Sequence, residues 1–143
     1  MDDAHNAASG DLQQRVAVRR CTRPAVITVE RHAHLAAAAY LMRQAHDTAV
    51  VVTTDDEHRR PIAVITETDI TQAVADHRDL NEARIDELVG PEPVTTHPDT
   101  AVGEATRLML SAGARHLPVV EDGRLVGIFD IADACRALVG TGP

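Results

Sequence analysis

The feature that most constrains the fold is an internal repeat. Residues 24–42 (PAVITVERHAHLAAAAYLM) and residues 92–109 (EPVTTHPDTAVGEATRLM) follow one pattern of apolar and polar positions, with Met42 matching Met109 at a shift of 67 positions. A repeated unit of this size buries too little apolar surface to be stable alone, so its copies pack together. We therefore expect two similar modules that share one hydrophobic core.

Each copy of the repeat predicts the element order β-α-β-β-α, which places the chain in the α/β (α+β) fold class. Apolar positions at helical spacing predict a helix beginning near Leu35 in the first copy and near Val102 in the second. Asp99 or Thr100 is expected to cap the second of these helices, with Glu104 in its first turn. The expected strands are 26–29, 49–53, 94–96 and 117–120, and the expected closing helices are 69–76 and 133–138.

The turn between the last two strands differs between the copies. In the second copy this turn contains Asp122 and Gly123, a pair typical of a tight β-hairpin. Asp69 matches Asp133 at a shift of 64 rather than 67 positions, so the first copy has three extra residues in its turn. Such an insertion costs least in a surface loop, which supports the alignment of the two copies.

The repeat also sets the expected domain boundaries. Residues 81–90 (NEARIDELVG) have the pattern of a connecting helix that ends at Gly90 before a proline, and residues 12–23 are its counterpart ahead of the first copy. We expect a disordered N-terminal tail over residues 1–14, a first module over residues 15–80 and a second module over residues 81–140.

Composition argues against several functional classes. A formal net charge of −8 repels polyanions, and a chain with one Tyr, one Phe and no Trp offers few surfaces for stacking bases, so no nucleic-acid partner is expected. No apolar stretch reaches the roughly 20 residues that span a bilayer. The polar N-terminal residues do not resemble a signal peptide, so we expect a cytoplasmic protein without a membrane partner. Cys21 and Cys135 are expected to be reduced and partly buried, with a redox bridge between them left open.

Two stretches of the sequence resemble the closing half of a CBS module. Residues 115–138 (RHLPVVEDGRLVGIFDIADACRAL) contain an R-x-L-P-V-V strand, a D-G turn, and a second strand that leads to an aspartate opening a helix. Residues 63–70 (AVITETDI) are similar to the last part of that pattern. The resemblance covers roughly residues 16–140. It implies a pseudo-twofold pair of modules with two clefts, which in such families often bind AMP, ADP, ATP or S-adenosylmethionine, and a homodimer of two pairs.

The resemblance, together with the chemistry of the side chains, assigns the ribose of such a nucleotide to Asp69 and Asp133. A carboxylate at the start of a helix accepts bonds from both ribose hydroxyls, and the helix N-terminus stabilises its charge. Thr66 and Thr68 add hydroxyl groups suited to phosphate. The alternatives are a plain N-cap aspartate and two solvent-facing threonines at a strand end. Asp130 stands in place of Thr66 in the second copy and repels phosphate, so the Asp69 cleft is the better candidate.

In the architecture that the resemblance implies, the opposite copy supplies a wall to each cleft. For the Asp69 cleft, backbone groups of this wall contact the adenine, while Arg115 and His116 supply cations for phosphate. The alternatives for these two residues are a solvated surface charge and a strand-edge residue. The wall of the Asp133 cleft lacks a basic pair and consists of Ile27, Thr28 and residues 47–49. The wall expected for the Asp69 cleft consists of Val94, Thr95, Thr96, Ala114, Arg115, His116 and Pro118.

These features favour a regulatory module that senses an adenine nucleotide and signals to a separate regulated protein. No nucleophile and base pair, P-loop or G-x-G-x-x-G motif is present, so we expect neither an enzyme nor a required cofactor. A metal site is not expected, because His32 and His34 are two positions apart on a helix start and do not face each other. The alternative is a non-catalytic interaction or scaffold protein that binds no nucleotide.

Overall fold

The computed structural model describes residues 12–22, 27–88 and 90–140, which form two compact units. The first-repeat unit consists mainly of residues 27–88, and the second-repeat unit of residues 12–22, 94–122 and 126–140. Buried apolar side chains form one cluster in each unit. Each unit therefore has a buried apolar cluster of its own, and the single shared core expected from the repeat stays a prediction.

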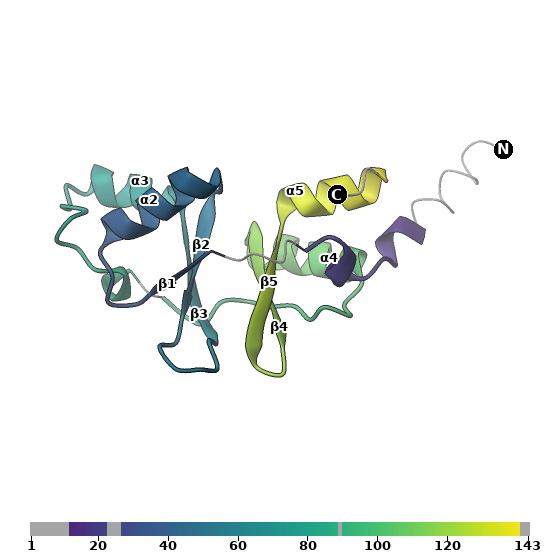
Figure 1. Ribbon diagram of the computed structural model, residues 1–143. Coiled ribbons are helices and arrows are strands. Elements are labelled where there is room, and N and C mark those ends of the chain that lie inside the picture. The colour runs from purple at the N-terminus through teal and green to yellow at the C-terminus, as the bar shows by residue number, and fades with distance from the viewer. Residues whose placement is uncertain (1–11, 23–26, 89, 141–143) are drawn as a thin grey trace. The chain divides into compact units, whose positions relative to one another are not determined.

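The first-repeat unit holds a three-stranded sheet in the order β1-β2-β3, with β1 parallel to β2 and β2 antiparallel to β3. Helices α2 and α3 pack side by side against this sheet (Figure 1). The expected strand over residues 49–53 is confirmed, and all five of its residues are buried. The elements are β1 (Thr28–Glu30), α2 (Leu35–Ala45), β2 (Ala49–Thr53), β3 (Pro61–Thr66), α3 (Glu67–Ala75) and the 3₁₀ helix η2 (Ile85–Glu87).

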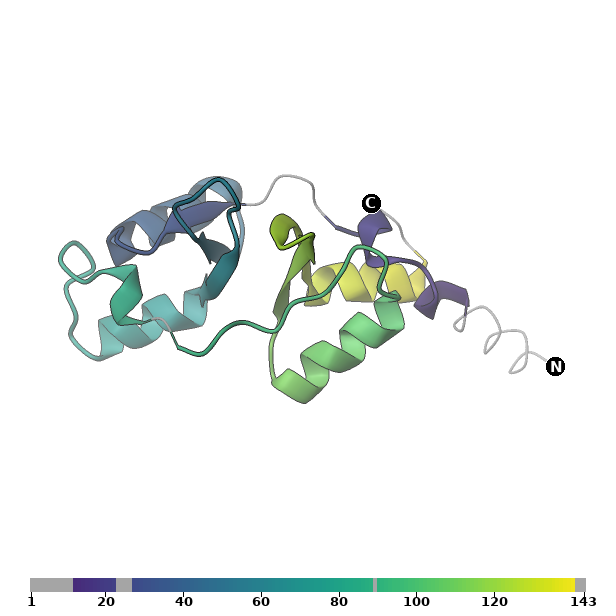
Figure 2. The ribbon, with the colours of Figure 1, turned by 90° about the horizontal axis from the view of Figure 1, so that it is seen from below.

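The second-repeat unit repeats this plan with one strand fewer. Strands β4 and β5 form a hairpin, and helices α4 and α5 lie side by side (Figure 2). The strand expected over residues 94–96 is reduced to a single parallel bridge between Thr96 and Val119. The elements are the 3₁₀ helix η1 (Val18–Arg20), α4 (Val102–Ala112), β4 (His116–Glu121), β5 (Arg124–Asp130) and α5 (Ile131–Val139).

The β4–β5 turn confirms the tight hairpin expected from the sequence. Asp122 and Gly123 have φ values of 53° and 77°, so both residues are left-handed, as a two-residue type I′ turn requires. The longer turn of the first repeat is closed by a backbone bond from the Thr54 N–H to Arg60 O at 2.9 Å and by side chains. The Thr54 hydroxyl donates to Asp56 at 2.8 Å and accepts from the Arg60 N–H at 3.0 Å.

Each unit is completed by the chain segment that precedes the other copy of the repeat. We call residues 12–22 the N-terminal strap and residues 81–88 the middle strap. The N-terminal strap pairs with the second-repeat unit through the bridge Ala17–Ala101, and the middle strap pairs with the first-repeat unit through the bridge His34–Arg84. The two bridges are related by the same shift of 67 positions, so the exchange is symmetric.

The hydrogen bonds of the two straps match one by one. The Val18 N–H donates to Thr100 O at 2.8 Å, and the Ile85 N–H donates to Ala33 O at 2.9 Å. Val18 and Ile85 are both fully buried. Because each strap adds a large apolar side chain to a core it does not precede in sequence, each unit has its own closed core.

The straps correct two sequence predictions about secondary structure. A connecting helix over residues 81–90 is wrong: only η2 is helical there, and residue 89 lies outside the described residues. The carbonyls of Leu80 and Ala83 accept from the N–H groups of Ala36 and Leu35, both at 2.9 Å, so they are not available to a local helix. Of the tail expected to be disordered, residues 1–11 lie outside the described residues and residues 12–14 form a helical turn.

The straps also explain why the expected helix caps are wrong. Ala101, rather than Asp99 or Thr100, is the N-cap of α4, and it makes no side-chain capping bond. The Val102 N–H instead donates to Val16 O of the N-terminal strap at 2.8 Å. A backbone carbonyl of a distant segment therefore accepts a hydrogen bond from the first turn of α4, in place of a capping side chain. Glu104 lies in the first turn of α4, as predicted.

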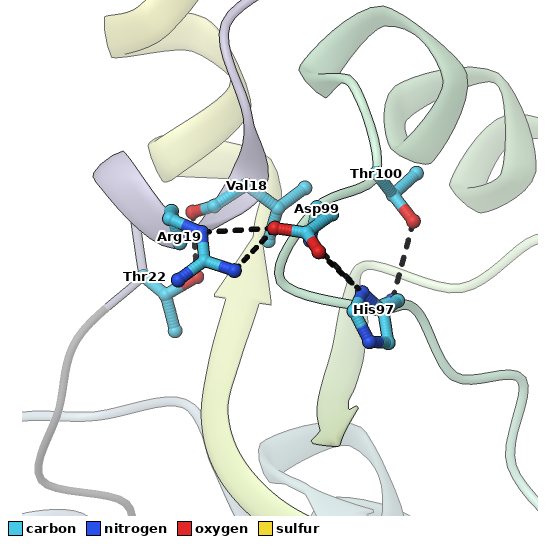
Figure 3. Close-up of polar contacts among 6 residues, drawn as sticks. All are labelled: Val18, Arg19, Thr22, His97, Asp99 and Thr100. Atoms are coloured by element: carbon cyan, nitrogen blue, oxygen red, sulfur yellow. Dashed lines mark hydrogen bonds and ion pairs between the residues drawn. The ribbon is translucent and has the colours of Figure 1, made fainter. Parts of the chain in front are cut away.

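The side chains near that cap tie the N-terminal strap to the loop before α4 (Figure 3). The Arg19 guanidinium donates to Asp99, and His97 Nδ1 accepts from the Asp99 N–H at 3.0 Å. At the same place in the first-repeat unit, His32 Nδ1 lies 3.4 Å from the carboxylate of Asp86. Each strap thus docks through a contact between a carboxylate and a basic side chain. The carboxylate belongs to the loop in the second-repeat unit (Asp99) and to the strap in the first-repeat unit (Asp86).

Candidate functional site

The candidate site of the first-repeat unit lies where β3 leads into α3. Thr66 is the N-cap of α3, and its hydroxyl accepts from the Asp69 N–H at 3.3 Å. The Asp69 Oδ2 atom accepts from the Thr66 N–H at 2.8 Å and from the Thr66 hydroxyl at 3.1 Å. The two residues form a capping box, so Asp69 has a capping role, as the alternative to ribose binding expected, although Thr66 rather than Asp69 is the N-cap.

This geometry leaves one carboxylate oxygen of Asp69 uncommitted. Both bonds to its side chain use Oδ2, and among the described residues no bond to Oδ1 is formed. Asp69 is half-buried, and Thr68 beside it is exposed. The positive end of α3 favours a negative charge at this point. The start of α3 therefore presents a fixed carboxylate oxygen and a free hydroxyl to solvent.

The start of α5 has the same capping box with a different N-cap. Asp130 replaces Thr66, its Oδ1 accepts from the Asp133 N–H at 2.8 Å, and its own N–H donates to Asp133 Oδ2 at 3.0 Å. Arg136 donates to the other oxygen, Asp133 Oδ1, at 2.6 Å. Asp133 is only 3% exposed, so both of its oxygens are occupied inside the protein.

The surroundings of Asp133 change its pKa, and Asp133 in turn affects the pKa of a neighbouring thiol. Burial raises the pKa of Asp133, the charge of Asp130 raises it further, and the bonds from the Asp130 N–H and Arg136 oppose the rise. Burial also raises the pKa of the Cys21 thiol, with the Asp133 carboxylate adding to the effect. Cys21 is half-buried as expected, whereas Cys135 is exposed, and both are free thiols.

The remaining predicted site residues belong to the second-repeat unit. Val94, Thr95 and Arg115 are exposed, His116 and Ala114 are half-buried, and Pro118 is buried. Thr96 is 7% exposed, and its hydroxyl oxygen has no hydrogen-bond partner among the described residues. A buried hydroxyl without a partner costs about 1–3 kcal/mol of folding free energy. Thr96 therefore differs from the other predicted site residues in carrying a polar group that a ligand could satisfy.

In each unit, one backbone bond joins the start of the last helix to the loop that follows the preceding helix. These helices are α3 and α2 in the first-repeat unit, and α5 and α4 in the second-repeat unit. The Glu67 N–H donates to Thr48 O, and the Ile131 N–H donates to Arg115 O, both at 3.0 Å. The structure therefore brings the loop at Ala114–His116 next to the start of α5 and Asp133. It likewise brings Asp47 and Thr48 next to the start of α3.

One residue of this region, Arg136, was missed by sequence reasoning, and one expected residue, Thr48, lines a cavity that was not expected. Arg136 binds Asp133 directly, and the spacing of three positions on a helix was the signal that could have revealed it. Thr48 lines a cavity of about 590 Å³ between the end of α2 and the start of α3, together with Arg43, His46 and Glu67. No local pattern in the sequence marks that cavity.

Neither a metal-binding cluster nor a membrane-spanning helix is found among the described residues. No group of three or more His, Cys, Asp or Glu side chains within residues 12–22, 27–88 and 90–140 is placed to hold a metal ion. In the same ranges, no helix combines the length and the hydrophobicity needed to cross a bilayer.

Comparison with known proteins gives relatives in both sequence and structure. An uncharacterized 17.7 kDa protein of Acidianus ambivalens is 34% identical over 115 residues, which are 80% of this chain and 68% of that relative. The CBS domain protein PAE2072 of Pyrobaculum aerophilum, solved in complex with AMP, matches with a TM-score of 0.80 and 26% identity over 88% of this chain and 98% of that chain.

A second solved structure is the CBS domain pair of protein MJ0100, in complex with 5′-methylthioadenosine and S-adenosyl-L-methionine. It matches with a TM-score of 0.78 and 26% identity, over 87% of this chain and 97% of that chain. The family model described as CBS domain matches this chain twice, at residues 18–76 and 85–140. The chain therefore belongs to the CBS domain family, as a tandem pair of CBS modules.

Proposed function

We propose that this protein is a regulatory, ligand-sensing module that binds an adenine nucleotide and signals to a separate protein. The observation that carries the proposal is the start of α3, where Asp69 keeps one carboxylate oxygen free in the first turn of the helix. The CBS structures complexed with AMP and with S-adenosyl-L-methionine support the choice of an adenine nucleotide as the ligand.

In this proposal the ribose binds at Asp69. The 2′- and 3′-hydroxyls of the ribose donate to the carboxylate, which the capping box holds in place before the ligand arrives. The exposed hydroxyl of Thr68 donates to a phosphate oxygen, while Thr66 serves as the fixed cap. The second repeat contributes the adenine and phosphate contacts proposed for Val94, Thr95, Thr96, Ala114, Arg115, His116 and Pro118.

The matching position in the second repeat is a weaker site in this proposal. A ribose hydroxyl would have to displace Arg136 from Asp133 Oδ1, and a phosphate would meet the Asp130 carboxylate. Both costs are absent at Asp69. We therefore propose one nucleotide per chain, bound at Asp69, with AMP, ADP, ATP and S-adenosyl-L-methionine as the four candidates and no cofactor required.

We further propose that the protein acts as a homodimer and without catalysis of its own. Large apolar side chains are exposed on each of α2, α3, α4 and α5, with exposed fractions of 61% for Tyr40, 56% for Val74, 72% for Leu110 and 70% for Val139. Burying these side chains against a second copy would remove apolar surface from water. Analytical ultracentrifugation tests the dimer, and cell fractionation tests the cytoplasmic location expected from the sequence.

Isothermal titration calorimetry with the four candidate nucleotides tests the function and the site together. Asp69→Asn keeps an acceptor for the capping box but removes the charge, so we expect affinity to fall by about tenfold or more. Asp133→Asn, the matched change in the other repeat, is expected to leave affinity unchanged. Equal affinity of Asp69→Asn and the wild type would overturn the site.

The same experiment decides between sensing and the scaffold alternative. If none of the four nucleotides gives heat at millimolar concentration, nucleotide sensing is wrong and an interaction module without a bound nucleotide is the better description. The occupied oxygens of Asp133 favour that alternative for the second repeat. Binding that depends on Asp133 and not on Asp69 would reverse the assignment of the two repeats.

A further inference from the structure

The second-repeat unit contains a cavity of about 640 Å³ between one face of α4 and the segment that leads into this helix. Its volume lies within the range of small-molecule sites. Thr96 lines this cavity, is 93% buried and has a hydroxyl oxygen without a hydrogen-bond partner among the described residues. A buried donor and acceptor left unpaired is the observation that points to a ligand.

The helix face that lines the cavity carries one charge of each sign. Glu104 and Arg107 are three positions apart on α4 and are therefore neighbours on its surface. Within residues 12–22, 27–88 and 90–140, neither side chain forms an ion pair, with the other or with any third group. An unpaired cation and an unpaired anion side by side suit a ligand that carries both charges.

The opposite wall supplies hydrogen-bond donors. His97 Nδ1 accepts from the Asp99 N–H at 3.0 Å and lies 3.7 Å from Asp99 Oδ2, so Nδ1 is engaged within the loop and Nε2 is the ring nitrogen left for a ligand (Figure 3). The Thr100 hydroxyl oxygen accepts from the His97 N–H at 3.3 Å, which leaves its hydrogen free to donate. Leu108 and Val120 add apolar surface to the lining.

We propose that this cavity is a second ligand site, for a small zwitterion of which a free α-amino acid is the simplest case. The carboxylate of the ligand pairs with Arg107, its ammonium group pairs with Glu104, and an apolar side chain rests on Leu108 and Val120. The charges of Glu104 and Arg107 cancel, so the cavity suits a zwitterion better than a polyphosphate, which carries several negative charges.

This site overlaps the nucleotide site proposed at Asp69 only at Thr95 and Thr96. Glu104, Arg107 and Leu108 belong to α4 and are not among the residues proposed to hold the nucleotide. Thr95 and Thr96 line the cavity and were also expected to contact adenine, so the two ligands are predicted to influence each other. An amino-acid site that persists in Asp69→Asn stands even if nucleotide binding fails.

The test is a titration of ¹⁵N-labelled full-length protein followed by amide chemical shifts. The probes are L-leucine, butyrate, butylamine and inorganic phosphate, so that each half of the zwitterion and a plain anion are tested alone. We expect L-leucine to shift the amides of Thr95, Thr96, Thr100 and Ser111, and butyrate and butylamine to bind about tenfold or more weakly.

Three variants separate a ligand site from a structural feature. Arg107→Gln and Glu104→Gln are each expected to weaken L-leucine binding by about tenfold, while Arg31→Gln, an exposed arginine of the other unit, leaves it unchanged. Thr96→Val removes the unpaired hydroxyl at nearly constant shape. It is expected to raise the melting temperature without ligand and to weaken L-leucine binding.

Each contrary outcome overturns the proposal. Shifts from inorganic phosphate but not from L-leucine would show an anion site instead of a zwitterion site. Absence of shifts with L-leucine and with a mixture of the other natural amino acids at millimolar concentration would show that the cavity takes no amino acid. A Thr96→Val protein that is more stable but binds L-leucine as the wild type does would assign the hydroxyl no role in binding.

Discussion

In both repeats the last helix, α3 or α5, begins with a capping box, but the N-cap side chain differs between them. Ile65 and Thr66 lead into α3, whereas Phe129 and Asp130 lead into α5 at the matching positions. The backbone bonds of the capping box are the same in both units. What differs is the second carboxylate oxygen: it is open on Asp69, whereas Arg136 occupies it on Asp133. A conserved frame thus says little about which repeat can bind.

The comparison also extends to how each core is filled. Phe129 is fully buried and is the only phenylalanine of the chain, while Ile65 fills the same place in the first repeat. The second-repeat core therefore adds one large ring to its aliphatic side chains, whereas the first-repeat core has no ring among its buried residues. Changing these pairs of residues tests which differences between the repeats matter.

The largest effect is expected in the cores. Phe129→Ala should lower the free energy of unfolding by about 3–5 kcal/mol, because it removes a fully buried ring. Ile65→Ala should cost less, about 2–4 kcal/mol, because less apolar surface is lost. Urea denaturation measures both, with Val126→Ala in the same strand as an exposed control. Equal losses for the two variants would show that the ring has no special part in its core.

The next effect concerns the paired carboxylates. Because the pKa of Asp133 is raised above its ordinary value of 3.8, the stability linked to its proton is complete below that value and is lost as pH rises through the raised pKa. Asp130→Thr copies the first repeat and removes one cause of the rise. We expect it to increase stability by about 1 kcal/mol at pH 7 and to have little effect near pH 3.

Urea denaturation at several pH values measures this difference. The reverse change, Thr66→Asp, introduces a second carboxylate beside Asp69 and serves as the mirror control, with a loss of stability expected at pH 7. A stabilisation by Asp130→Thr that is the same at pH 3 and pH 7 would show that repulsion between carboxylates is not its cause.

A smaller effect is expected where the central helices end. Both α2 and α4 end in a left-handed residue, which is His46 with φ 54° in the first repeat and Gly113 with φ 66° in the second. A side chain is strained in this conformation and glycine is not. His46→Gly should therefore gain roughly 0.5 kcal/mol, and Gly113→Ala should lose about 1 kcal/mol. Thermal melts compare the two, and a loss in His46→Gly would mean that the His46 side chain contributes contacts worth more than the strain.

The smallest effect is expected at the ion pair of the N-terminal strap. Arg19 and Asp99 have side chains that are 52% and 67% exposed, and such pairs add little stability in salt. Arg19→Gln should leave the melting temperature unchanged at physiological ionic strength, whereas Val18→Ala in the same strap should lower it clearly. An equal drop for both would show that the strap is held by charge rather than by apolar burial.

Much of the fold follows from local patterns in the sequence. The run of β-branched residues predicts β2, the Asp-Gly pair predicts the β4–β5 turn, and the apolar spacing predicts α2 and α4. The sequence also identifies Asp69 and Asp133 as related residues at helix starts. These predictions succeed because each depends on interactions between residues close in the chain.

The predictions that fail all involve contacts between distant segments. No local pattern indicates that Val16 O caps α4, so Asp99 and Thr100 were the natural choices for that cap. The connecting helix was expected from propensity, and a strap bonded to α2 forms instead. The repulsion of phosphate expected for Asp130 stays a prediction, and the structure adds that Asp130 Oδ1 accepts from the Asp133 N–H within the same unit.

The exchange of straps has a consequence for synthesis on the ribosome. The first-repeat unit draws on a nearly continuous stretch, so it can close once residue 88 has emerged. Arg19 must wait for Asp99, which is 80 residues away, and at about 5–20 residues per second this delay lasts roughly 4–16 s. The N-terminal strap is therefore synthesised before the first repeat but docks after it. Vectorial synthesis thus allows the first-repeat unit to fold before the second-repeat unit.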